Sequence, residues 1–125
     1  MQASTLPDLR HKKLVDEKLW KRLVGRVMKD EGKTREKAES IMDEALCFLK
    51  LCADFPKERF APSRGVDIGW HAFLMYTREY AEFCQRVAGR FIHHAPSDDD
   101  KPVKVTVQAT VSFMQRRGLI FNEEL

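Results

Sequence analysis

Long apolar runs are absent from this chain of 125 residues, and none approaches the roughly 20 residues of a membrane-spanning helix. The first residues, MQASTLPDLRHKK, also lack the apolar core of a secretory signal. Cysteine is scarce, and Cys47, Cys52 and Cys84 cannot form a closed set of disulfides. These absences favour a reducing, cytoplasmic setting without a membrane partner.

Several sequence motifs of enzymes are missing as well. The chain has no glycine-rich phosphate loop, no Gly-x-Ser-x-Gly elbow, and neither Cys-x-x-Cys nor His-Glu-x-x-His spacing. Cys84 falls on a predicted core face, while Cys47 falls off the core stripe of its helix and is expected to be partly exposed. No catalytic residue is assigned, and whether the chain is an enzyme stays open.

Length and composition fit one folded unit, expected to span residues 1–125. The chain is 43% hydrophobic and 33% charged, which is typical of a globular domain and argues against disorder. A chain of this length buries enough apolar surface to fold without disulfides or a structural metal ion.

Apolar spacing predicts helices over residues 8–30, 34–53, 66–88 and 105–117, with Gly32 ending the first and Thr34 capping the second. Proline and glycine place a loop at 54–65, and residues 90–105 form a connector with a short extended piece at 91–93. The expected fold class is all-α, a small single-domain bundle of about four helices with an irregular, histidine-containing connector.

Positive charge is concentrated in the first third of the chain. The net charge is +3, yet residues 10–37 hold eleven Lys or Arg against five Asp or Glu. One ridge of the first predicted helix carries Lys18, Arg22, Arg26 and Lys29. The ridge is either a solvated helix face or the contact surface of a non-enzymatic adaptor that binds nucleic acid or an acidic protein partner. No exposed aromatic platform accompanies it.

The third predicted helix and the segment after it combine imidazole with carboxylate. Asp67 and His71 are four residues apart and share one helix face, and His93 and His94 follow the helix end closely. Trp70, Phe73, Leu74, Thr77, Tyr80, Ala81, Cys84, Val87 and Ala88 form the predicted core face. Asp67, His71, His93 and His94 could supply the ligands of a zinc or iron ion. The alternative is a polar site in which Asp67 pairs with His71 and the other histidines have structural roles.

Residues 62–96 resemble the glycine-rich-domain-containing-protein-like family. The resemblance is carried by Val66-Asp67-x-x-Trp70-His71 and by Gly89-x-Phe91-Ile92-His93-His94-x-Pro96. It implies kinship more than activity, although larger plant members resemble regulatory or RNA-associated proteins. Many members have a second histidine two places after the Trp-His pair, where this chain has Phe73. The resemblance still places Asp67, His71, His93 and His94 in the family's most characteristic segment.

Overall fold

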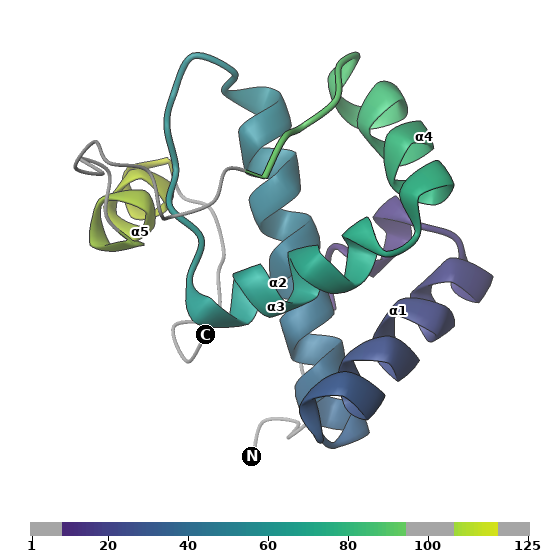
Figure 1. Ribbon diagram of the computed structural model, residues 1–125. Helices are drawn as coiled ribbons and strands as arrows, with labels where there is room; N and C mark the ends of the chain where they lie inside the picture. The colour runs from purple at the N-terminus through teal and green to yellow at the C-terminus, as the bar shows by residue number, and fades with distance from the viewer. Residues whose placement is uncertain (1–8, 95–106, 118–125) are drawn as a thin grey trace, which may run out of the picture.

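The computed structural model describes residues 9–94 and 107–117, and their regular structure is entirely helical (Figure 1). A short 3-10 turn, η1 (Lys12–Leu14), precedes five helices: α1 (Glu17–Glu31), α2 (Arg35–Asp54), α3 (Arg64–Leu74), α4 (Thr77–Ala88) and α5 (Val107–Arg116). The all-α class is therefore confirmed. The expected count of about four helices becomes five, because residues 66–88 form two helices instead of one.

Helix ends follow local capping chemistry. Thr34 accepts a hydrogen bond from the backbone N–H of Lys37, and Gly32 ends α1 with a left-handed φ of 63°, as predicted. The first helix begins later than expected, at Glu17, because the Asp16 side chain accepts from the N–H of Leu19 and sets the helix start there. The expected start near residue 8 lies outside the described residues.

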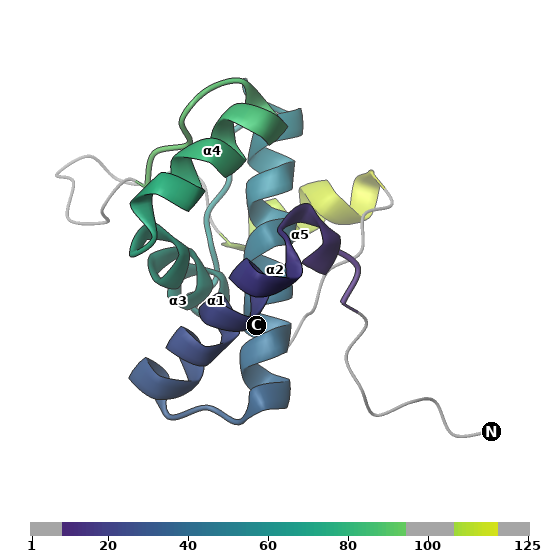
Figure 2. The ribbon, with the colours of Figure 1, turned by 90° about the vertical axis from the view of Figure 1, so that its right-hand side faces the viewer.

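The central element is α2, which is surrounded by other helices. Both ribbon views show α1, α3 and α4 on one flank of α2, whereas α5 lies on another side (Figures 1 and 2). Residues 41–49 are consequently buried around the whole circumference of the helix, including Cys47. The expected partial exposure of Cys47 is wrong, because Phe113 and Met114 of α5 cover that side.

A glycine allows α3 to cross α2 at short range. A Cβ atom at Gly69 would lie 2.7 Å from the Cβ of Ala45 and 3.1 Å from the carbonyl oxygen of Ile41. Any larger residue at this position would push the two helices apart, because both neighbours belong to the rigid body of α2. Gly69 therefore fixes how closely the start of α3 approaches the core.

The single helix predicted over 66–88 breaks after Leu74. The ring centroids of Phe73 and Phe83 lie 5.1 Å apart, although ten residues of straight helix would separate them by about 15 Å along the axis. A break at Tyr76, with φ −106° and ψ 71°, lets α4 fold back over the same core. The break also shifts the helical phase, so Thr77 and Ala81, predicted to be in the core, are exposed.

The last helix, predicted over 105–117, is found as α5 at Val107–Arg116. Its Phe113 ring packs edge-on against Phe55 and Phe60 of the loop that precedes α3, with centroids 5.1 and 5.0 Å apart. Thr110 accepts a hydrogen bond from the N–H of Ala61 at 2.8 Å. These contacts hold the loop against α5. None of the described helices has the length and apolar character that crossing a membrane requires.

Candidate metal centre

A buried hydrogen-bond network fixes the segment that follows α4. Trp70 donates its indole N–H to the Tyr80 hydroxyl at 2.9 Å, and that hydroxyl donates to the Ile92 carbonyl at 2.6 Å. Tyr80 is fully buried, in agreement with its place on the predicted core face. Burial raises the pKa of Tyr80 well above its usual value, which keeps the hydroxyl protonated and able to donate. The chain at residues 91–94 is thus tied to both α3 and α4.

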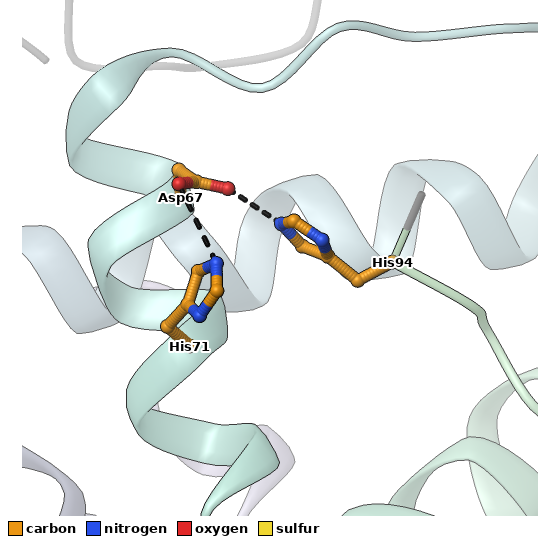
Figure 3. A group of neighbouring side chains, drawn as sticks. All are labelled: Asp67, His71 and His94. Atoms are coloured by element: carbon orange, nitrogen blue, oxygen red, sulfur yellow. Dashed lines mark hydrogen bonds and ion pairs between the residues drawn. The ribbon is translucent and has the colours of Figure 1, made fainter. Parts of the chain in front are cut away.

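Two residues beyond this anchor, His94 reaches the first turns of α3. Its Nε2 lies 2.5 Å from Oδ1 of Asp67, and Nε2 of His71 lies 3.7 Å from Oδ2 of the same carboxylate (Figure 3). The two imidazole rings are 4.6 Å apart at their centroids. One nitrogen from each histidine and one carboxylate oxygen all lie within 4.8 Å of one another. The fold therefore brings together three of the four residues singled out in the sequence.

The fourth residue, His93, lies outside this cluster. Its side chain is exposed and its ring packs against Phe91, with centroids 4.8 Å apart. Neighbouring side chains of a non-helical segment point in different directions, and the burial of Ile92 together with the placement of His94 leaves His93 facing away. Sequence adjacency alone could not distinguish the two histidines.

The cluster is open to solvent on one side and supported on the other. The side chains of Asp67 and His71 are 43% and 62% exposed, whereas His94 is only 17% exposed. The Trp70 ring supports His94 edge-on, with centroids 4.5 Å apart. The His94 imidazole is thus held against Trp70, whereas Asp67 and His71 are largely exposed. This arrangement is suited to replacing the hydrogen bond between His94 and Asp67 by a bond to another ligand.

Two hollows flank the cluster. A groove of about 290 Å³ between α1 and α3 is lined by Asp67, His71 and the exposed Met75, together with residues at the end of α1. On the other side, a cavity of about 360 Å³ is lined by His94 and Trp70. The cluster therefore has room for a small molecule on either side.

The basic ridge of α1 does not present four equivalent cations. Lys18 and Lys29 are exposed, but the Arg22 guanidinium lies 4.6 Å from the centre of the Tyr76 ring and 3.4 Å from a Glu79 oxygen. Arg26 also lies over Tyr76, at 5.6 Å, and pairs with Asp30 at 3.7 Å. Half of the ridge thus joins α1 to the break between α3 and α4.

Sequence reasoning missed two polar contacts that only the fold creates. His11 donates its backbone N–H to the buried carboxylate of Asp43 at 2.7 Å, and its ring lies 3.4 Å from the other oxygen. The second is the hydrogen bond between the Trp70 indole N–H and the Tyr80 hydroxyl. The spacing of these two residues was the only feature of the sequence that pointed to it. The contact between His11 and Asp43 joins residues 32 positions apart, so no local pattern in the sequence could predict it.

The cysteine thiols carry no evident chemistry. Burial raises the pKa of Cys47 and of Cys52 to about 12, so both are protonated thiols at neutral pH. Cys84 is also buried, as predicted, and all three are free of disulfides. Nucleophilic cysteine chemistry is not favoured at any of them.

Comparison with known proteins identifies a family but no individual relative. No curated protein and no solved structure is significantly similar to this chain. A family model described as UCP032817-like matches residues 10–109, and this description names no activity. The finding overturns the resemblance to the glycine-rich-domain-containing family, which rested on residues 62–96. Much of that motif, including Trp70 and Ile92, serves packing and the buried network. Because this family model covers most of the chain, the protein belongs to the UCP032817-like family.

Proposed function

We propose that Asp67, His71 and His94 bind a divalent transition-metal ion, with zinc and iron(II) as the first candidates. The observation that carries this proposal is the convergence of two imidazole nitrogens and one carboxylate oxygen within 4.8 Å. Neutral imidazole with carboxylate is a ligand set that both ions accept. Residues 67 and 94 are far apart in sequence, so the convergence is a product of the fold.

The geometry needs a small adjustment to receive an ion. Ligand atoms of a tetrahedral zinc site, with bonds of about 2.1 Å, lie about 3.4 Å apart. Nε2 of His94 and Oδ1 of Asp67 are closer than this, at 2.5 Å, because they share a hydrogen bond. The ion would replace the shared proton, and rotation of the half-exposed Asp67 side chain would supply the remaining distance.

Three protein ligands leave at least one coordination position for water or a small molecule. Open sites of this type supply Lewis-acid chemistry or an activated water when an ion is bound. In this chain Trp70 holds His94, the backbone of α3 holds Asp67 and His71, and the flanking hollows give access. The proposal names a metal-binding site and assigns no reaction to it.

Two alternatives remain distinct from this proposal. In the first, Asp67 accepts a hydrogen bond from His94 and pairs with His71 at 3.7 Å, and no ion is bound. In the second, the protein is an adaptor that uses Lys18, Arg22, Arg26 and Lys29. The adaptor gains no support from the contacts of Arg22 and Arg26, which already join α1 to Tyr76.

The test is titration of the metal-free full chain with zinc and cobalt(II), followed by calorimetry and visible absorption. We expect one ion per chain, release of protons, and a cobalt spectrum without thiolate charge-transfer bands. Zinc at 100 times its dissociation constant should stabilise the fold by about 2.7 kcal/mol.

The chain offers a matched control. His71→Ala and His94→Ala should weaken zinc binding at least tenfold, whereas His93→Ala, which removes the neighbouring imidazole outside the cluster, should leave it unchanged. Equal zinc affinity in all three variants, or no uptake by the folded wild type, would contradict the proposal and favour the purely polar site.

A further inference from the structure

The cavity beside His94 is a built pocket with aromatic walls. It is lined by residues from the end of α2, the loop before α3 and the segment 90–94, and its volume is about 360 Å³. This volume falls within the range of small-molecule sites in proteins, at its lower end. Four aromatic side chains line it: Phe48, Phe60, Trp70 and Phe91.

The walls are held in place by ring contacts. The Phe48 ring lies 5.6 Å from that of Trp70 and 6.5 Å from that of Phe60, measured between centroids. Phe48 and Trp70 are about 95% buried by the rest of the protein. Such a surface is complementary to an apolar or aromatic body and loses little conformational freedom when it binds one.

The side chain of Arg90 adds a cation to the lining of this cavity. Arg90 donates from Nη2 to the Cys52 carbonyl at the end of α2, at 3.0 Å, which orients the guanidinium. A guanidinium has five N–H donors in a planar fork that matches a carboxylate, and this contact occupies one of them. Glu58 also lines the cavity and is exposed. Among the described residues that line the cavity, Arg90 beside Glu58 suits a singly charged acid better than a phosphate dianion.

We propose that this cavity binds a small organic acid with an apolar or aromatic body, whose carboxylate pairs with Arg90 while its body lies among Phe48, Phe60 and Trp70. Nothing in the family description assigns such a site.

The position of the cavity links the acid to the candidate metal centre. Arg90 and His94 stand at the two ends of a segment whose four residue steps span at most about 14 Å, and both residues line the cavity. An acid anchored at Arg90 would extend toward His94. The orientation toward a metal ion rests on the proposed function, whereas binding of the acid in the cavity does not.

The experiment uses phenylacetate as the probe, with phenylacetamide and phenethylamine as its neutral and cationic counterparts. Each is titrated into the full chain, with and without zinc, and followed by ¹H–¹⁵N NMR. We expect phenylacetate to shift the indole signal of Trp70 and the amides of residues 90–94, while the indole of Trp20 in the core serves as the internal reference.

Two arginine variants sharpen the result. Arg90→Gln should raise the dissociation constant of phenylacetate at least tenfold. Arg86→Gln, which alters another exposed arginine of the same region outside the cavity lining, should leave it unchanged. Glu58→Gln should strengthen binding of the acid, because it removes a like charge.

The outcomes separate the two proposals. Zinc binding without any phenylacetate shift would overturn the cavity proposal and leave the metal site standing. Phenylacetate binding that depends on Arg90, in a protein that takes up no zinc, would support the acid site and overturn the metal site. Equal affinity for phenylacetate and phenylacetamide, or preference for phenethylamine, would overturn the assignment of an acid.

Discussion

The two faces of α3 hold polar groups in opposite ways. Trp70 and His71 are neighbours in sequence, but Trp70 is 5% exposed and donates to a buried hydroxyl, while the His71 side chain is 62% exposed. On the core face, Trp70, Tyr80 and the Ile92 carbonyl form a closed network. On the outer face, Asp67 faces two histidines that water can reach.

The difference concerns which polar groups are able to change partners. Among the described residues, no buried side-chain nitrogen or oxygen lacks a hydrogen-bond partner. Breaking a buried bond leaves a desolvated group unpaired, which costs about 1–3 kcal/mol. On the outer face, water replaces the partner of a broken hydrogen bond. A metal ion can therefore displace such a bond at a lower cost in free energy. Stability and metal binding should therefore map to different faces of α3.

The largest difference in the free energy of unfolding is expected between alanine variants of Phe73 and of His71. Phe73 is fully buried against Tyr80 and Phe83, so Phe73→Ala should lower the free energy of unfolding by about 3–5 kcal/mol. His71→Ala should change it by less than about 0.5 kcal/mol, because its side chain is mostly exposed. Urea denaturation measures both, and a similar loss in the two variants would remove the distinction between the faces.

A Tyr80 variant should affect both faces of α3, because it should lower stability and zinc affinity together. Tyr80→Phe leaves the Trp70 N–H and the Ile92 carbonyl without their partner, and should cost about 1–3 kcal/mol. Because the Ile92 anchor positions His94, the same variant should weaken zinc binding by about 10-fold or more.

Phe91→Ala is the control for this variant. It removes an exposed ring from the same segment but keeps the hydroxyl network, so zinc affinity should hold. Full zinc affinity in Tyr80→Phe would show that the network supports the fold without positioning the site.

A smaller effect should appear at alkaline pH. The pKa of Cys47 and of Cys52 is raised from 9.0 to about 12 in the folded protein, so the unfolded chain loses these protons first. Stability is therefore unaffected by these thiols below pH 9 and falls as pH rises from 9 toward 12. At pH 10 the loss is about 1 kcal/mol per thiol.

Thermal denaturation between pH 8 and pH 11 measures this dependence. Cys52→Ala should flatten the curve while keeping the backbone carbonyl that receives Arg90. An unchanged slope in that variant would mean that its thiol is accessible to water in the folded state.

The smallest effect concerns the basic ridge of α1. Arg22→Gln should cost about 0.5–1 kcal/mol, because its guanidinium contacts the Tyr76 ring and Glu79 at the surface. Lys18→Gln should be neutral. If the ridge binds nucleic acid, only a double change of the exposed Lys18 and Lys29 would test it without disturbing the break at Tyr76. Salt-dependent binding that is lost in that pair would support the adaptor hypothesis.

Local sequence signals predicted the features that depend on neighbouring residues. Gly32 and Thr34 end and begin their helices as expected, because left-handed φ and N-capping are decided within one turn. The break at Tyr76 was not predicted, since the chain from 66 to 88 contains no proline or glycine except Gly69. Its cause is tertiary, because α4 must return to the core that Phe73 already occupies.

The candidate site shows the same division. The sequence by itself determined that Asp67 and His71 share a helix face, because that follows from a spacing of four residues. Only the tertiary structure decided that His94 joins them and His93 does not, since the Tyr80 anchor on Ile92 sets how the segment passes α3. Periodicity is a local property of the backbone, whereas the convergence of distant side chains depends on how helices pack.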